Sequence, residues 1–561
     1  MANRSGDILA KPEWCFNRSV FKAAGYSEDD LDRPIIGIAN SWNDLVPGHT
    51  NLRQLAEHVR KGIHKAGGSV AEFGVIAACD GTAQGHAGMH YILPSRDLIA
   101  NDIEVMVQAH RLDGIVLLGS CDKIVPAMLM AAARLRIPAI LLPGGPMLGG
   151  VEFDGRKSDL TTMSEGLGML NSGKISIERY GQLEETCGPT CGSCAFYGTA
   201  NTMCCMAEAM GMSLPGAALV PGVYNDRFRL GESTGMAIVD LVRKQLTADK
   251  VITFESLENA IRVLMATGGS TNAVLHLTAI AAELEIPAAQ MMDAYDRLSA
   301  STPQLAKVNP SSKYDMEDFH RAGGIPRVMQ TMSSLLHGDC LTVSGETIAQ
   351  NLQNYRYKFP HNPEVISTID APFGTHKGLA ILRGNLAPAT AVTKPAAIDP
   401  AMHVFSGVAR VFDSEEAAEA AILGGKICAG DVIVIRYEGP KGGPGMREMY
   451  KAMKYLYGMG LAKKTALITD GRFSGTNNGC FVGHISPEAA DGGPLAAVAD
   501  GDRITIDIPQ GVLHLHLEDH EIAARLENWQ RPKPKFNRGY LGVYSRLASS
   551  AAEGAVIRCP E

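Results

Sequence analysis

Short apolar runs alternate with amphipathic stretches through the first part of the chain. Between the runs, apolar residues recur at helical spacing, as over 52–63 and Arg96–His110. This βαβ succession predicts a doubly wound, mostly parallel α/β sheet. The runs with the length and composition of buried strands are 34–39, Phe73–Ala78, Gly114–Leu118 and Ala139–Leu142.

The pattern changes along the second half of the chain. Residues 251–370 are mainly helical and carry one polar loop, Gly268–Asn272, which is either an anion-binding nest or a helix–helix connection. Beyond residue 370, β-type segments dominate and few long helices intervene. We therefore expect two domains, an α/β domain over 1–370 and a β-rich, barrel-like domain over 371–561. The clearest β segments are Asp431–Tyr437, Thr465–Thr469, Arg503–Ile508 and Val512–Leu517.

Composition narrows the class of protein. With 561 residues, 45% of them hydrophobic and 20% charged, the chain is expected to be a soluble protein with more than one core. No apolar run reaches the roughly 18 residues of a membrane span, and the N-terminus lacks the apolar stretch of a signal peptide, which predicts a cytoplasmic location and no membrane partner. The net charge of −8 without a basic block argues against nucleic acid. Twelve cysteines in such a chain are core thiols, metal ligands or nucleophiles rather than a disulfide framework.

Two Cys-Asp pairs follow predicted strands. Cys79-Asp80 comes after the second strand, and Cys121-Asp122-Lys123 lies on the turn between the third strand and a helix over Pro126–Leu135. The carboxyl ends of parallel strands meet at one edge of a sheet, where α/β proteins bind ligands. A soft thiolate beside a hard carboxylate could hold two different metals. A capping Asp beside a small buried Cys is the alternative at either turn alone, and the recurrence of the pair favours metal binding.

A third cysteine group has the spacing CxxxCxxC. Cys187, Cys191 and Cys194 lie in a loop rich in Gly, Pro and Ser that precedes a predicted helix over Asn201–Met212. Loop cysteines at such spacing commonly bind an Fe–S cluster or zinc, with unconnected thiols as the alternative. Cys204 and Cys205 continue into an apolar helix and are expected in the core.

Two loops of the second domain carry candidate chemistry. KGGPGMREM places Glu448 after a glycine-rich turn, and TDGRFSGTNNG places Ser474 just beyond a strand. Ser474 is either a turn residue or a reactive group. As a nucleophile it needs a histidine partner, and its surroundings are not a GxSxG elbow.

Several motifs together resemble one protein family. They are CDGTAQGHAGM, LPSRDLIA, CDKIVP, CGSCAFYGTANTM, YEGPKGGPGMREM, ITDGRFSG and GHISPEAADGG. In this order they resemble the dihydroxy-acid dehydratase / 6-phosphogluconate dehydratase family over roughly residues 30–545. The resemblance implies an N-terminal α/β domain, a C-terminal barrel-like domain, a homodimer or dimer of dimers, and an Fe–S cluster (2Fe–2S or 4Fe–4S) beside a magnesium ion.

The resemblance also implies roles for individual residues. Cys121 and Cys194 match cluster cysteines, and Ser474 matches the catalytic base, with His484 or His49 as the next candidates. Lys123 matches a lysine that is carbamylated in the family, a modification that turns a cation into a metal ligand. The residues that match magnesium ligands, besides Lys123, are Asp80, Asp122 and Glu448.

The chain departs from the family pattern at two places. The 2Fe–2S branch has Pro-Cys-Asn where this chain has Pro47-Gly48-His49, so one cluster cysteine is missing. Cys79 is the expected replacement, and Cys191 is the alternative. The second departure is Ala195–Gly198, AFYG, which is closer to the sugar-acid branch of the family.

The implied activity is the dehydration of a 2,3-dihydroxy carboxylic acid to a 2-keto acid. The first expectation for the substrate is a dihydroxy acid of branched-chain amino-acid biosynthesis. A sugar acid, of the aldonate or phosphogluconate type, is the alternative. From a different class, an Fe–S sensor without activity would share the cysteines, but would not need Glu448 and Ser474.

Overall fold

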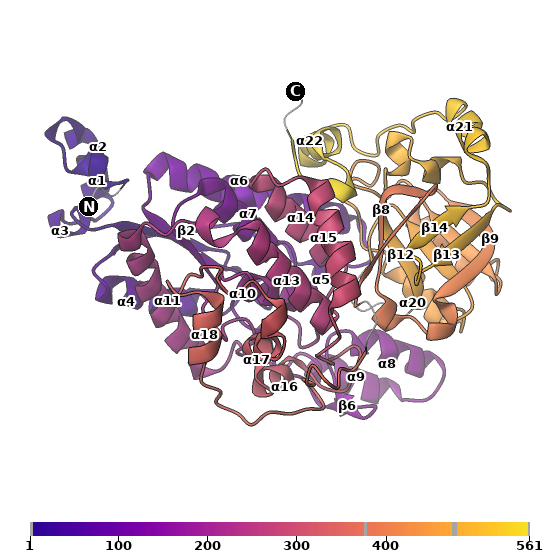
Figure 1. Cartoon of the computed structure of the whole chain (residues 1–561), viewed down its shortest axis with the longest axis horizontal. Helices are drawn as coiled ribbons and strands as arrows, with labels where there is room; N and C mark the ends of the chain where they lie inside the picture. The colour runs from indigo at the N-terminus through magenta and orange to yellow at the C-terminus, as the bar shows by residue number, and fades with distance from the viewer. Residues whose placement is uncertain (1–3, 375–377, 474–478, 559–561) are drawn as a thin grey trace.

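The computed structural model describes residues 4–374, 378–473 and 479–558. Figure 1 shows the N-terminal part of the chain around a sheet and the C-terminal strands gathered at the opposite end of the molecule. The N-terminal sheet has four parallel strands in the order β2-β1-β3-β4, which confirms the predicted parallel α/β sheet. The strands are β1 (Ile35–Asn40), β2 (Ser69–Gly74), β3 (Gly114–Leu118) and β4 (Ala139–Leu142).

The prediction was wrong for one of these strands. The strand expected over Phe73–Ala78 lies over Ser69–Gly74, where Gly74 pairs with Asn40, the last residue of β1. In β2, an edge strand, the exposed residues Glu72 and Gly74 alternate with half-buried ones and interrupt the apolar run. The apolar residues after Gly74 instead form the segment that leads to Cys79.

Helices pack against this sheet. Helix α4 (Leu52–Lys65) contacts β1 and β2, and α11 (Asn225–Lys244) contacts β3 and β4. The two helices also pack closely on each other through glycines. A Cβ atom at Gly62 would lie 2.1 Å from the carbonyl oxygen of Glu232, and one at Gly235 would lie 2.2 Å from that of Val59. Substitution at either glycine would push the helices apart.

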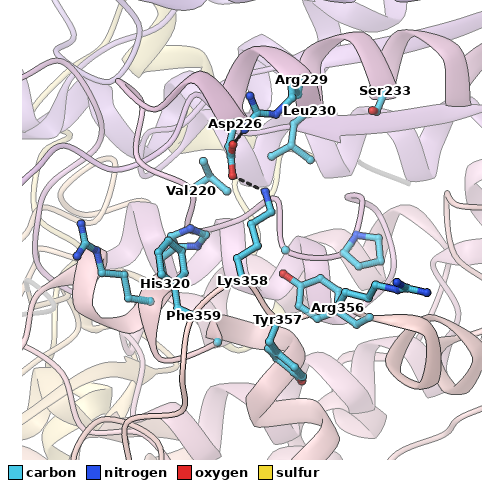
Figure 2. Close-up of a pocket in the computed structure, with 15 residues that line it drawn as sticks. Val220, Asp226, Arg229, Leu230, Ser233, His320, Arg356, Tyr357, Lys358 and Phe359 are labelled. Atoms are coloured by element: carbon cyan, nitrogen blue, oxygen red, sulfur yellow. Dashed lines mark hydrogen bonds and ion pairs between the residues drawn. The ribbon is translucent and has the colours of Figure 1, made fainter.

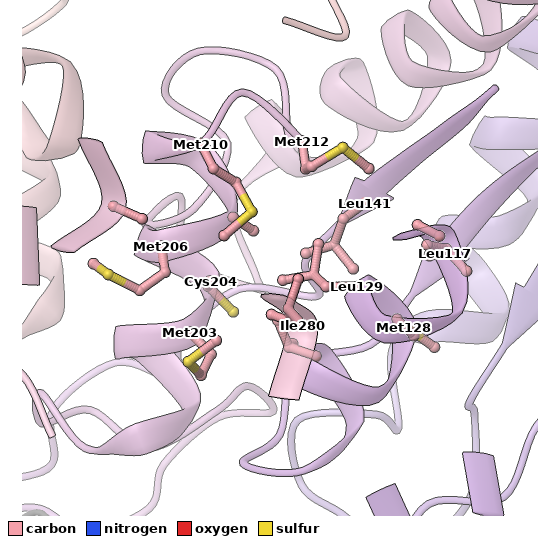
Figure 3. Packing of buried hydrophobic residues seen from close by; sticks show 14 of the residues in the cluster. Leu117, Met128, Leu129, Leu141, Met203, Cys204, Met206, Met210, Met212 and Ile280 are labelled. Atoms are coloured by element: carbon pink, nitrogen blue, oxygen red, sulfur yellow. The ribbon is translucent and has the colours of Figure 1, made fainter. Parts of the chain in front are cut away.

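A methionine-rich core fixes the helices that carry the candidate site. Helix α7 (Ile124–Leu135) packs between α6 (Ile92–His110) and α10 (Thr199–Ala209). Figure 3 shows Met128 of α7 near Leu117 of β3, with Met203 and Cys204 of α10 in the same cluster. Cys204 and Cys205 are buried there, as predicted. Helix α10 begins two residues before the predicted start, so Thr199 lies at its first turn.

The segment between the sheet and the barrel is mainly helical, as predicted. Its loop Gly268–Asn272 connects α13 to α14, and Gly268 adopts the left-handed conformation that ends α13. The helices of this segment are α12 (Ala248–Val251), α13 (Phe254–Thr267), α14 (Asn272–Glu283), α15 (Ala288–Ser301), α16 (Met316–Arg321), α17 (Gly324–Thr331) and α18 (Ile348–Asn354).

The C-terminal strands form a closed barrel, which confirms the barrel-like prediction. The order around the barrel is β10-β11-β12-β8-β7-β14-β13-β9. Strands β9 to β12 pair in parallel, with helices α19 (Glu415–Leu423) and α20 (Lys451–Gly458) in their connections. The strands are β7 (Ala380–Gly384), β8 (Ala387–Thr393), β9 (Val404–Phe412), β10 (Asp431–Ile435), β11 (Ala466–Thr469), β12 (Cys480–Ser486), β13 (Arg503–Asp507) and β14 (Val512–Leu515).

The end of the described chain returns to the N-terminal part. The fully buried guanidinium of Arg96 in α6 donates to the carbonyl oxygens of Gly554 and Ala555, at 2.8 and 2.9 Å. Asp97 accepts from the backbone N–H of Ile557. These bonds hold the two parts together, while the domain division at 370/371 stays a prediction. Among the described residues, no helix has the length and apolar character needed to cross a membrane.

Candidate active site

The two Cys-Asp pairs meet at one edge of the sheet, as predicted. Cys79 has extended backbone directly before the short helix α5 (Asp80–Ala83), and Cys121 lies in the turn between β3 and α7. The Cys121 carbonyl oxygen accepts from the N–H groups of Ile124 and Val125, which fixes the turn. The Cys121 thiol lies 3.8 Å from Oδ1 of Asp80. One ligand atom from each of Cys79, Asp80 and Cys121 lies within 4.8 Å of the others.

A group of three carboxylates adjoins the thiols. Oxygen atoms of Asp80, Asp122 and Glu448 lie within 4.8 Å of one another. Glu448 lies between β10 and α20, in the part of the chain that forms the barrel. Lys123 is wholly buried beside them, with Nζ 3.4 Å from Oδ2 of Asp122. The four residues that match magnesium ligands are thus adjacent in space, although they come from segments more than 300 positions apart.

Burial and mutual repulsion dominate the electrostatics of the carboxylates. Burial raises the pKa of Asp80 well above its ordinary value, and the charges of Asp122 and Glu448 raise it further. Burial also acts on Asp122, but Lys123 and a hydrogen bond from Asp80 hold the pKa of Asp122 below its ordinary value. Three carboxylates in one buried place need a positive charge or a proton between them.

The thiols have unequal acidities. A hydrogen bond from Cys121 lowers the pKa of Cys79 to about 6, and the same bond raises the pKa of Cys121. Burial raises the pKa of Cys194 well above its ordinary value, with further contributions from Asp80 and Asp122. Cys79 is therefore the thiol that ionises first.

One cavity of about 400 Å³ brings these groups together. Cys79, Cys121 and Cys194 all line it, with Asp80 and Asp122. The carbonyl oxygen of Cys194 accepts from the Asn201 amide at 2.6 Å, which fixes the loop before α10. Much of the remaining wall is apolar. Its apolar side chains include Leu45, Val46, Met147, Leu160 and Phe196.

The loop at Gly48 lies on the same cavity and leaves little room for a side chain. The N–H of Gly192 donates to the carbonyl oxygen of Pro47 at 3.0 Å. A Cβ atom at Gly48 would lie 3.0 Å from the backbone nitrogen of Ser193. Gly48 thus allows these two loops to touch, at the position where the 2Fe–2S branch of the resembling family has a cysteine.

The three cysteines of the CxxxCxxC loop do not converge. Cys187 packs with Phe153 and Leu183 in a separate small apolar cluster. Cys191 is half-buried, and among the described residues it does not line the cavity that holds Cys194. The expectation of a single three-cysteine metal site in this loop was therefore wrong, because the loop turns at Gly192, where φ is 138°, and carries only Cys194 inward.

Glu448 is held by three side chains that the sequence reasoning missed. It forms a buried ion pair with Arg472, accepts from the Asn272 amide at 2.9 Å and accepts from the Gln84 amide at 3.0 Å. All three lie in segments that sequence reasoning had singled out, the DGRFSG and CDGTAQG motifs and the Gly268–Asn272 loop. The loop is a helix–helix connection, and it also contacts an anionic group, the Glu448 carboxylate.

Three residues were candidates for the catalytic base, and the structure describes two of them. Ser474 lies outside the described residues. His49 is fully buried, its Nδ1 lies 2.8 Å from the carbonyl oxygen of Ser41, and its Nε2 accepts from the Ser120 N–H at 3.1 Å. Burial lowers the pKa of His49 to about 4, and both ring nitrogens are engaged with backbone, so His49 is a structural residue. His484 is buried as well, and burial, with Arg472 and Lys123, lowers its pKa to about 3.

A second cavity has different chemistry. It measures about 190 Å³ and is lined by basic and aromatic side chains, with Lys358 reaching Asp226 across it (Figure 2). Arg229, His320 and Phe359 also line it. Among the described residues that line this cavity there is no cysteine and one carboxylate, Asp226. The thiol and carboxylate chemistry therefore belongs to the first cavity.

Comparison with known families matches both parts of the chain. The model described as "Dihydroxy-acid/6-phosphogluconate dehydratase N-terminal" matches residues 33–351, and its C-terminal counterpart matches residues 364–555. The chain belongs to the dihydroxy-acid/6-phosphogluconate dehydratase family. This confirms the resemblance and makes the chain a member of a family of hydro-lyases.

Full-length relatives extend across bacteria and archaea. A dihydroxy-acid dehydratase of Caldanaerobacter subterraneus is 51% identical over 559 residues, 99% of each chain. One of Methanosarcina barkeri is 49% identical over 558 residues, 99% of this chain and 100% of the relative. One of Pyrococcus furiosus is 50% identical over 555 residues, 98% of this chain and 99% of the relative. The similarity to these relatives therefore extends over both the sheet edge and the segment that carries Glu448.

Proposed function

We propose that the protein is a hydro-lyase that depends on an Fe–S cluster and magnesium and converts a branched-chain 2,3-dihydroxy acid to a 2-keto acid. The observation that carries this proposal is the cavity lined by three thiols and two carboxylates, with a third carboxylate, Glu448 from the other half of the chain, close to those two. The names of the full-length relatives, dihydroxy-acid dehydratases, support the same activity.

The donor sets fit the two cofactors. Asp80, Asp122 and Glu448 offer oxygen ligands, which suit magnesium, and their mutual repulsion is what a divalent cation would relieve. Cys79, Cys121 and Cys194 offer three thiolates, which suit an Fe–S cluster of either type with one iron left open. When bound, the two metals would act as Lewis acids, polarising the carboxylate with its 2-hydroxyl and drawing off the 3-hydroxyl.

Lys123 and Ser474 complete the proposed machinery. Lys123 is proposed to carry a carbamate, because a buried ammonium cannot ligate a cation. Ser474 is proposed to take the C2 proton. Both roles rest on the family motifs CDKIVP and ITDGRFSG.

The apolar wall of the cavity favours an aliphatic substrate. Leu45, Leu160 and Phe196 offer no partners for the extra hydroxyls of a sugar acid, which would lose their hydrogen bonds with water. In the segment Ala195–Gly198, which suggested the sugar-acid branch, Phe196 lines the cavity with an apolar ring, and the hydroxyl of Tyr197 is buried and pairs with Thr267. This favours the branched-chain dihydroxy acid over gluconate or its phosphate.

We also propose a homodimer or dimer of dimers in the cytoplasm. Helix α2 (Cys15–Ala23) has no buried residue and exposes Phe16 and Val20, a face suited to a second copy. Light scattering on the purified protein should give twice or four times the mass of the chain. A monomer would contradict this part of the proposal.

The experiment that tests the activity is a substrate comparison. Anaerobically purified and reconstituted protein is assayed for 2-keto acid formation from 2,3-dihydroxyisovalerate and from gluconate. We expect kcat/KM to favour the branched acid by about 10²-fold or more, because several hydroxyls would enter an apolar wall unpaired. Equal or higher kcat/KM for gluconate would support the sugar-acid alternative, and no turnover of either acid would support a sensor.

A further inference from the structure

Glu448 has little acceptor capacity left. Its Oε1 atom accepts from Arg472 and Asn272, and its Oε2 atom accepts from Gln84. A carboxylate offers about four acceptor positions, so one position on Oε2 stays open for a cation. The three donors therefore determine how Glu448 can meet the proposed magnesium ion.

Asn272 links Glu448 to a second predicted ligand. Its amide nitrogen donates to Glu448 at 2.9 Å and to Oγ1 of Thr199 at 3.0 Å. Thr199 lines the cavity, and a hydrogen bond between its side chain and Asp122 helps to hold the pKa of Asp122 low. Asn272 is fully buried at the first turn of α14, so its amide is held in one position.

Gln84 makes the equivalent contact from the opposite side of the carboxylate. It ends helix α5, four positions after Asp80, and lines the cavity. Its amide nitrogen must face Glu448, because the reversed amide would place two acceptors against each other.

Both amides leave a buried oxygen without a partner. Oε1 of Gln84 and Oδ1 of Asn272 have no hydrogen-bond donor among the described residues. Buried polar atoms are almost always paired, so these two oxygens indicate donors beyond those that residues 4–374, 378–473 and 479–558 supply. Magnesium usually keeps several of its waters in proteins, and each such water, or a substrate hydroxyl that replaces it, is an O–H donor.

We propose that Gln84 and Asn272 are positioning residues for the magnesium site. Each holds Glu448 through its amide N–H and accepts, through its carbonyl oxygen, an O–H group that the metal brings into the cavity. The group is water in the resting enzyme and a hydroxyl of the substrate during turnover. This inference rests on the proposed magnesium site and assigns to it two residues that the family motifs left without a role.

The test is calorimetric titration of Mg²⁺ into the anaerobically prepared, cluster-loaded protein. Gln84→Met and Asn272→Leu keep the approximate side-chain volume and remove both polar groups. We expect each to weaken the Kd for Mg²⁺ by about 10–100-fold while the visible spectrum of the cluster is retained. At saturating Mg²⁺, a raised KM for the dihydroxy acid would support the contact with the substrate hydroxyl, and an unchanged KM would overturn that contact.

A matched control separates this role from a loss of stability. Asn259 is also fully buried, and its amide pairs with the backbone of His337 rather than with any predicted ligand. Asn259→Leu should lower the thermal midpoint and leave the Kd for Mg²⁺ unchanged. If Asn272→Leu does not fold, the half-buried Gln84 still decides the matter.

Two outcomes count against different claims. Unchanged Mg²⁺ affinity in both variants, with a wild type that binds Mg²⁺, would overturn the positioning role. A wild-type protein that does not bind Mg²⁺ at all would instead count against the proposed function.

Discussion

Cysteines with similar sequence surroundings have different environments in this protein. Cys191 and Cys194 are three positions apart in one loop, yet only Cys194 lines the cavity with Cys79 and Cys121. The spacing of the cysteines alone predicted a shared metal site. That prediction failed because spacing carries no information on the direction in which a glycine-rich loop turns. The positions of Cys79 and Cys121 in the segments that follow β2 and β3 were a better guide, because sheet geometry fixes the edge at which those segments begin.

The cluster assignment predicts a colour change for three cysteines. Replacing Cys79, Cys121 or Cys194 with Ser removes a thiolate from the cavity and should abolish the brown chromophore and the activity together. Cys191→Ser and Cys204→Ala are the matched controls, and both should stay coloured. Visible absorption and iron content provide the measurement. A colourless Cys191→Ser with a coloured Cys79→Ser would show that Cys191 is the third ligand.

Ser474 is the residue proposed to take the C2 proton of the substrate. Ser474→Ala removes the proton acceptor and leaves the thiols and carboxylates in place. The variant should keep its chromophore and bind substrate, but its kcat should fall by about 10²–10⁴-fold, as for loss of a general base. Steady-state kinetics measure the effect. Near-normal turnover would assign the proton transfer to another group, with His484 as the next candidate.

At the scale of elements, the fully buried strands β3 and β4 were predictable, whereas β2, which has exposed positions, was not. Strands β3 and β4 are buried on both sides, so each is an unbroken apolar run and both were placed correctly. Strand β2 was misplaced, because Glu72 and Gly74 are exposed and interrupt its apolar pattern. Closure of the barrel depends on pairs such as β9 with β13 and β7 with β14, which lie far apart in the chain. No local pattern encodes those pairings.

Helix α19 begins with a buried carboxyl group that should make stability depend on pH. Burial raises the pKa of Glu415 to about 8, with Glu419 and Glu438 adding to the shift and Arg447 opposing it. The folded protein therefore binds this proton more tightly than the unfolded chain does. Its contribution to stability is complete below about pH 4.5, the ordinary range of the group, and is lost as pH rises through about 8.

Glu415→Gln should remove this dependence, because the amide stays neutral. Between about pH 6 and pH 9, the free energy of unfolding of the wild type should fall by about 1–3 kcal/mol relative to the variant. Urea unfolding of both proteins at the two pH values provides the measurement. Parallel changes in the two proteins would show that Glu415 is already ionised in the folded state.

At the scale of the whole molecule, the candidate site requires both halves of the chain. Cys79, Cys121 and two carboxylates come from the sheet edge, Cys194 comes from the loop before α10, and Glu448 comes from the segment after β10. The family motifs predicted that Glu448 belongs to this site. They could not predict that Gln84, Asn272 and Arg472 hold it there, because this depends on how remote segments meet in space.

The most direct test of the account follows the hydrogen at C3 during turnover in D₂O. In the proposed reaction the C2 proton and the 3-hydroxyl leave, and the resulting enol takes its new C3 hydrogen from solvent. NMR of 2,3-dihydroxyisovalerate with the reconstituted enzyme should therefore show the 2-keto acid carrying one deuterium at C3, with methyl signals not split by a C3 proton. The substrate has no hydrogen at C3, so a keto acid with protium there would show that the hydrogen moved from C2 without exchange; that result, or the absence of any keto acid, would contradict the proposed dehydration.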